Sequence, residues 1–312
     1  MSCRLERNIE VRMIVVTGGA GFIGSVLVSK LNASGFTDIL IVDQKLDSSP
    51  KKNNLAKLKY QDCLDSSKFL LDIKKGLYNQ KVKAIFHQGA CSSTTEMNRD
   101  YLKENNTEYS VALCSWSLNE KVYFSYASSA ATYGNGNKGY SDSDELTLQL
   151  EPLNPYGESK LKFDQWLIKN AYHNSVTGFR YFNVYGPNEY HKHDMRSLVH
   201  KGFEQIRDKG FLRLFKSYKK DYADGEQKRD FIYVWDVVNV VLWFFQHPEL
   251  KGIYNLGTGR AHSWNELAHS LFSAMGRETK IEYFDMPEGL KEQYQYFTQA
   301  DMTKLNDAGC PV

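Results

Sequence analysis

A glycine-rich stretch close to the N-terminus, residues 15–24 (VVTGGAGFIG), constrains the fold of this chain more than any other feature. The apolar run at residues 13–16 is typical of a buried parallel strand, and a helix with apolar periodicity begins at Phe22. Glycines in such a turn let backbone N–H groups approach a pyrophosphate, and the N-terminus of the helix adds partial positive charge there. The stretch therefore predicts a dinucleotide-binding loop.

The next predicted strand, residues 38–42, ends in Asp43, where an acidic residue typically binds the ribose hydroxyls of an adenine dinucleotide. Asp43 alone would repel a 2′-phosphate and favour NAD. Lys45, Lys51 and Lys52 follow closely and can reach that phosphate through charge-assisted contacts. We therefore predict NADP as the cofactor.

Strands and helices alternate through the first part of the chain. Further strands are predicted at residues 82–87, 122–127 and 176–182, and helices at residues 65–74, 101–118 and 156–172. This alternation predicts an α/β fold with a Rossmann-type, doubly wound parallel sheet, whose ligands lie beyond the carboxyl ends of the strands.

The pattern becomes irregular after Gly186-Pro187, which predicts a smaller α/β substrate-binding lobe. The expected division is an N-terminal extension at 1–12, an NADP-binding domain at 13–182 and a mainly substrate-binding lobe at 183–312. Some segments of that lobe are expected to return to the first domain.

Composition excludes several classes of function. The net charge is only +2, and basic residues alternate with acidic ones, so no patch favours nucleic acid. No apolar run approaches the ~20 residues that span a bilayer, and the polar N-terminus is not a signal peptide.

The five cysteines are scattered without a C-x-x-C pair, which favours a reducing cytoplasm and no metal site. His191 and His193 lack further ligands at metal-binding spacing.

Tyr156 and Lys160 form the second informative pattern, because their spacing places them on one face of a helix. A phenol titrates near pH ~10, and a nearby ammonium would lower its pKa toward neutrality. Ser129 follows a predicted strand and could hold the oxygen of a substrate while Tyr156 transfers the proton. The spacing alone is also compatible with an aromatic ring stacked on a lysine side chain.

The motifs TGGAGFIG, SSAATYG, YGESK and RYFNVYGP resemble the extended short-chain dehydrogenase/reductase family over nearly the whole chain. The resemblance implies a bound nicotinamide dinucleotide, a catalytic group of Ser129, Tyr156 and Lys160, and a nucleotide-sugar substrate in the second lobe. Lys160 would also hold the nicotinamide ribose. We further expect a homo-oligomer.

The segments HQGACSSTTE, KRDFIYV, YNLGTGRAHSW and YQYFTQAD are similar to the nucleotide-sugar epimerases of that family that invert C6 of an ADP-linked heptose, with NADP, for lipopolysaccharide synthesis. With the loop glycines, the implied cofactor site comprises Gly18, Gly21, Phe22, Ile23, Gly24, Asp43, Gln44, Lys51, Gln88, Gly89, Ala90, Cys91, Ser92, Asn105, Lys160 and Val184. The implied substrate site comprises Asn183, His200, Lys201, Arg229 and Tyr294.

Lys192 is a further candidate, because the family places a lysine there. An epimerase that oxidises and re-reduces one carbon needs a proton donor on each side of the ketone, and Lys192 could face Tyr156. The alternative is a loop lysine that contacts phosphate.

The sequence departs from the family pattern in several places. Asp194 stands where the family has a serine, a lysine expected near Ser66 is absent, and the loop at 215–229 is longer. The family's closing helix would follow Val312, so the rim of the second lobe is expected to be open or incomplete.

Two other functions stay open. An NAD-dependent 4-epimerase would share the fold, and so would a non-catalytic dinucleotide-binding protein, although the latter commonly lacks the Tyr/Lys pair. A 4,6-dehydratase is disfavoured, because the acid pair that it needs is replaced by residues 130–133, AATY.

Overall fold

The computed structural model describes residues 13–44, 49–292 and 294–311. The expected N-terminal extension and Lys45 lie outside the described residues.

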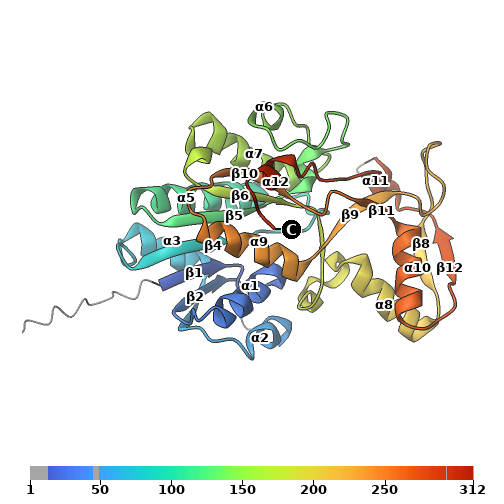
Figure 1. Cartoon of the computed structure of the whole chain (residues 1–312), viewed down its shortest axis with the longest axis horizontal. Helices are drawn as coiled ribbons and strands as arrows, with labels where there is room; N and C mark the ends of the chain where they lie inside the picture. The colour runs from blue at the N-terminus through green and yellow to red at the C-terminus, as the bar shows by residue number, and fades with distance from the viewer. Residues whose placement is uncertain (1–12, 45–48, 293, 312) are drawn as a thin grey trace, which may run out of the picture.

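Seven parallel strands form the central sheet (Figure 1). In spatial order they are β10 (Gly252–Leu256), β6 (Thr177–Tyr181), β5 (Tyr123–Ser129), β4 (Val82–His87), β1 (Met13–Thr17), β2 (Ile39–Asp43) and β3 (Asp62–Asp65). From β1 the chain adds β2 and β3 on one side, then crosses to build the rest of the sheet on the other. The predicted doubly wound fold is therefore confirmed, and a ligand crevice is expected where β1 and β4 end side by side.

Helices cover both faces of this sheet, as its continuous apolar strands require (Figure 1). One face carries α1 (Phe22–Ala33), α2 (Ser49–Leu55), α9 (Val234–Gln246) and α12 (Thr303–Asp307). The other face carries α3 (Ser66–Lys74), α5 (Tyr109–Asn119) and α7 (Pro155–Lys169). The predicted N-cap of α3 is confirmed, because the Asp65 side chain accepts a hydrogen bond from the Ser67 N–H at 2.9 Å.

The helix predicted at residues 101–118 is not uniform. It comprises α4 (Arg99–Leu102), the π-helical η1 (Lys103–Glu108) and α5. Because a π-helical turn changes which side chains share a face, η1 directs Asn106 inward, where it is 1% exposed.

The second lobe lies at one end of the molecule, around α8 (Leu198–Lys209) and α10 (Trp264–Ala274) (Figure 1). Its core includes Ile206, Leu212 and Phe272. Its strands form a sheet of β11 (Ala261–Ser263), β9 (Lys228–Tyr233) and β7 (Asn183–Tyr185), and a parallel pair of β8 (Leu212–Phe215) and β12 (Ile281–Phe284).

Three elements that follow residue 182 pack with the large sheet: β10 pairs with β6, and α9 and α12 cover one of its faces. The division at residue 182 stays a prediction. The remaining short elements are η2 (Ala130–Tyr133), α6 (Asp144–Thr147), η3 (Tyr172–Asn174), η4 (Tyr190–Met195) and α11 (Glu288–Lys291).

Candidate active site

The glycine loop follows β1 at the sheet's ligand edge. Gly18 has φ +65°, and a Cβ there would lie 2.7 Å from Gly89 Cα, so the loops after β1 and β4 can meet only without a side chain. A Cβ on Gly24 would collide with the carbonyl oxygen of Gly18. These close approaches leave a backbone cradle of the kind that a pyrophosphate fills.

Asp43, at the end of β2, is already held by the protein. Its carboxylate accepts hydrogen bonds from the Ala20 N–H at 3.0 Å and the Gln44 N–H at 2.7 Å. Lys51 Nζ lies 2.6 Å from Oδ1 of Asp43 and also donates to the Gln44 carbonyl at 2.7 Å. The lysine thus neutralises the carboxylate beside the adenine-ribose position.

The loop after β4 offers one unpartnered polar group. Gln88 Oε1 accepts a hydrogen bond from the Tyr181 hydroxyl at 2.8 Å, while its buried Nε2 has no hydrogen-bond partner within the described ranges. A buried amide left in this way costs free energy unless a bound group accepts its hydrogen. A bound dinucleotide can accept hydrogen bonds from the backbone N–H groups of the glycine loop and from Gln88 Nε2, so these donors fit that ligand.

Asn106 joins the loop after β4 to α7 through its side-chain hydrogen bonds. Its Oδ1 accepts from the Cys91 N–H at 2.8 Å, and its Nδ2 donates to the Cys91 carbonyl at 3.0 Å and to Ser159 Oγ at 2.9 Å. Sequence reasoning missed Asn106, because only the π-helical turn distinguishes it from its neighbour Asn105.

Tyr156 and Lys160 lie in the first turns of α7. The helix begins at Pro155, and the Asn154 side chain caps it by accepting from the Gly157 N–H at 2.8 Å. Tyr156 is 8% exposed and Lys160 is 5% exposed. Both side chains therefore project from a rigid helix into the cavity that they help to line.

The electrostatics of this pair differ from expectation. Burial raises the pKa of Tyr156, and a hydrogen bond with Ser129 opposes that shift. Lys160 Nζ donates to the Ala127 carbonyl at 2.9 Å, and burial lowers the Lys160 pKa to about 8. The expected lowering of the Tyr156 pKa by Lys160 is therefore wrong for this structure, since the burial of the phenol dominates.

One cavity of about 890 Å³ brings most of the predicted residues together. Its lining includes Gly18, Gly21, Phe22, Ile23, Gly24, Asp43, Lys51, Gln88, Gly89, Ala90, Cys91, Ser92, Ser129, Tyr156, Lys160, Asn183, Val184, Lys192, Lys201 and Tyr294. The charged lining residues are Asp43 and the cations Lys51, Lys160, Lys192, Arg196, Lys201 and Arg213. This excess of positive charge complements ligands that carry phosphates.

Four predicted residues lie outside that lining: Gln44, Asn105, His200 and Arg229. Gln44 Nε2 donates to Asn105 Oδ1 at 3.1 Å. His200 packs its ring on Tyr190, with ring centres 4.9 Å apart.

Arg229 was expected at the mouth of the second lobe, but the structure buries it. Its guanidinium carbon lies 5.5 Å from the ring centre of Trp264 and 5.1 Å from that of Tyr294. Its nitrogens donate to the carbonyls of Lys228, at 2.9 Å, and Gln295. Trp264 and Tyr294 line the cavity and form part of an aromatic wall. Arg229 therefore supports this wall from behind the two rings.

Sequence reasoning also missed the rest of that wall. Phe215 and Phe284 line the cavity with ring centres 4.7 Å apart, and Arg213 lies over Phe284 at 4.3 Å. The parallel pairing of β8 with β12 brings these residues together, and no local pattern in the sequence indicates that pairing.

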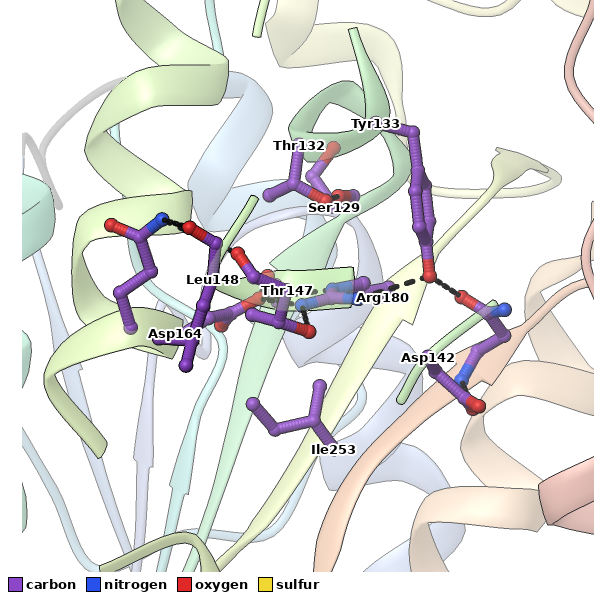
Figure 2. Close-up of polar contacts among 12 residues, drawn as sticks. Ser129, Thr132, Tyr133, Asp142, Thr147, Leu148, Asp164, Arg180 and Ile253 are labelled. Atoms are coloured by element: carbon purple, nitrogen blue, oxygen red, sulfur yellow. Dashed lines mark hydrogen bonds and ion pairs between the residues drawn. The ribbon is translucent and has the colours of Figure 1, made fainter. Parts of the chain in front are cut away.

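A buried ion pair, Arg180 with Asp164, lies near Ser129 (Figure 2). Arg180 on β6 and Asp164 on α7 have no side-chain exposure and are 3.0 Å apart. Asp164 also accepts from Ser128 Oγ at 2.9 Å, next to Ser129, and Arg180 donates to the Tyr133 hydroxyl at 3.0 Å. The pair thus fixes α7 relative to the end of β5.

Comparisons with known proteins place this site in a family. Residues 14–257 match the NAD-dependent epimerase/dehydratase family. The chain belongs to that family. Membership assigns a nicotinamide dinucleotide as the cofactor class, which agrees with the glycine loop and Gln88.

Several family members are similar over almost the whole chain. An ADP-L-glycero-D-manno-heptose-6-epimerase of Nitratidesulfovibrio vulgaris is 50% identical, covering 96% of this chain and 93% of that protein. One of Alkalilimnicola ehrlichii is 48% identical, covering 96% and 92%. The crystal structure of the Helicobacter pylori enzyme of that name has a TM-score of 0.80 and 29% identity, covering 97% and 92%.

A Thermotoga maritima UDP-glucose 4-epimerase in this family, solved with UDP-glucose, has a TM-score of 0.75 and 28% identity, covering 94% of this chain and 91% of that one. Across the described part of the chain, no cluster of three or more His, Cys, Asp or Glu side chains could hold a metal, and no helix is long and apolar enough to cross a membrane.

Proposed function

We propose that this chain is an epimerase that inverts C6 of the heptose in ADP-D-glycero-D-manno-heptose to give ADP-L-glycero-D-manno-heptose. The observation that carries this proposal is that two proton-carrying side chains from different elements, Tyr156 and Lys192, line one cavity. The names of relatives that are 48–50% identical over 96% of the chain support the heptose as substrate.

The first half of the reaction uses Tyr156 and Ser129. Ser129 holds the C6 oxygen while Tyr156, which must act as the phenolate, takes the hydroxyl proton. The dinucleotide, when bound, supplies a hydride acceptor and donor. Oxidation at C6 leaves a ketone, which keeps the carbon skeleton intact.

The second half uses Lys192. The ketone must turn in the cavity so that hydride returns to its other face, and its oxygen then points away from Tyr156. Lys192, which lines the same cavity, would protonate that oxygen, and the burial that lowers its pKa makes the ammonium a better acid. The hydride returns to C6, and Lys192 supplies a proton in place of the one that Tyr156 took. Proton exchange with solvent then resets both side chains, so the net change is the inversion of C6.

The preferred dinucleotide in this proposal is NADP. Lys51 neutralises Asp43 at 2.6 Å, which reduces the repulsion that a 2′-phosphate would meet. Titration of the dinucleotide-free protein with NADP and NAD tests this, with tighter binding of NADP expected and loss of that preference in Lys51→Ala. Clearly tighter binding of NAD would contradict it.

The substrate is tested by incubating the protein with ADP-D-glycero-D-manno-heptose and following the heptose side chain by NMR. Appearance of the C6 epimer is expected, and parallel reactions with UDP-glucose test for 4-epimerase activity. Turnover of UDP-glucose alone would replace the proposal. A role in lipopolysaccharide synthesis, a homo-oligomeric state and a cytoplasmic location stay predictions from the sequence.

A further inference from the structure

A segment of the second lobe, residues 188–195, lies against the cofactor-binding loop; we call it the strap. Asn54, at the end of α2, is buried between the two. Its Nδ2 donates to the carbonyl of Ala20 in the glycine loop and to the carbonyl of Asn188 in the strap, each at 3.1 Å. One amide group therefore joins the strap to the glycine loop.

Other contacts follow the same boundary. Asn188 Nδ2 donates to Ser25 Oγ on α1 at 3.0 Å. His191 Nδ1 lies 3.4 Å from Asn54 Nδ2. Lys192 Nζ lies 5.4 Å from the ring centre of Phe22, the first residue of α1. The strap thus presents Lys192 directly over the start of the helix that follows the glycine loop.

The same end of the strap is also held by the second lobe. Glu189, 1% exposed, accepts hydrogen bonds from Ser197 N–H at 2.5 Å and Ser197 Oγ at 2.7 Å. Ser197 is the N-cap of α8. The strap therefore spans from the second lobe to the cofactor-binding elements, and its position depends on both.

We propose that Asn54 is a positioning residue that holds the strap, and with it Lys192, against the glycine loop. The importance of Lys192 rests on the proposed function, but the placement of the strap does not. One buried amide donates to two carbonyls on separate elements, so those elements have little freedom to move apart. Removal of the amide would leave both carbonyls without this hydrogen bond. A misplacement of about 1 Å at a reacting group costs about 10²-fold in rate.

The contacts also bear on retention of the cofactor. The strap lies over Phe22 at the helix start where a pyrophosphate would bind, so a dinucleotide leaving by this side would have to displace it. Asn54 is expected to slow that departure although it is absent from the cavity lining.

The experiment compares the wild-type chain with Asn54→Ala, Asn188→Gly and the control Asn53→Ala. Asn53 is the exposed neighbour on α2, and glycine suits the φ of +74° at position 188. Acetylation of each lysine by an amine-reactive ester is followed by peptide mass spectrometry, without ligand. In Asn54→Ala and Asn188→Gly, Lys192 should be acetylated about tenfold faster than in the wild type. Lys160 in these two variants, and both lysines in the control Asn53→Ala, should be acetylated at the wild-type rate.

Two activity-linked measurements accompany the labelling. Release of NADP should be faster in Asn54→Ala, and epimerisation of the ADP-heptose should lose kcat more than it raises KM. If the wild type does not epimerise the heptose, the proposed function fails, and labelling still decides the role of Asn54.

Unchanged Lys192 labelling in folded Asn54→Ala would overturn the inference. Equal acceleration at Lys160 would do the same, because it would reveal general loosening. If Asn54→Ala does not fold, Asn54→Asp, which keeps the size of the side chain and lacks the Nδ2 donor, gives the same decision.

Discussion

Tyr156 is the residue on which the proposed chemistry depends most. Tyr156→Phe removes the proton-carrying hydroxyl and keeps the ring that packs in the cavity wall. Activity should fall by ~10²–10⁴-fold, the usual contribution of general acid–base catalysis, with little change in melting temperature. Steady-state kinetics and thermal unfolding measure the two, and near wild-type turnover would exclude Tyr156 from the mechanism.

Lys192→Met separates the two halves of the proposed reaction. Epimerisation should be suppressed, because no acid meets the turned ketone. Oxidation of one epimer through Tyr156 should persist and is detected as single-turnover reduction of the bound dinucleotide.

A raised KM with normal kcat for Lys192→Met would instead indicate a phosphate contact. Loss of both half-reactions would contradict the two-acid proposal, since Lys192 would then be needed before any proton moves.

His87 gives a pH dependence of stability that is separate from catalysis. Its ring bonds to Thr17 Oγ1 at 2.6 Å and Ser110 Oγ at 2.8 Å, and burial lowers its pKa to about 3 from 6.5. Below pH ~6.5 the unfolded chain binds a proton that the folded chain does not. The free energy of unfolding should therefore fall by about 1.4 kcal/mol per pH unit toward pH 4 from this group.

Urea denaturation of wild type and His87→Gln at several pH values measures that contribution. The variant should show a shallower slope between pH 6 and 4, whatever its absolute stability. Identical slopes would show that His87 does not titrate as described.

At the scale of elements, the Arg180–Asp164 pair joins β6 to α7 and, through Ser128, to β5 (Figure 2). Arg180→Met would leave a carboxylate buried without its cation and should lower the free energy of unfolding by about 3–5 kcal/mol. Lys162→Met, on the exposed side of α7, should change it by less than about 0.5 kcal/mol. Chemical denaturation compares the two, and equal small effects would mean that the pair contributes little.

The sequence predicts the elements well where local physics determines them. The glycine loop and the α3 cap at Asp65 depend on residues close in the chain, and the structure has both. β3 was missed because its residues, DCLD, are partly exposed at a sheet edge and lack an apolar run. β7 and β11 have only three residues each, too few for a periodic pattern.

In the candidate site, too, the sequence indicates the contacts between residues that are close in the chain and misses those between distant segments. Tyr156 and Lys160 share one helix, so their spacing alone indicates their proximity. The aromatic wall depends on β8 and β12, and the inward turn of Arg229 depends on Trp264 and Tyr294. Contacts between distant segments carry no local signature, and burial of the phenol, which reverses the expected pKa shift of Tyr156, is also set by the whole fold.

At the scale of the molecule, part of the second lobe, comprising β7, α8, β8 and β9, is built by chain that lies between β6 and β10. The central sheet therefore stays one strand short until residues 252–256 pair with β6. During synthesis, β6 would leave the ribosome well before its partner and present an unpaired parallel edge. Completion of the central sheet thus waits until the first part of the second lobe has been translated, so the two parts of the molecule mature together.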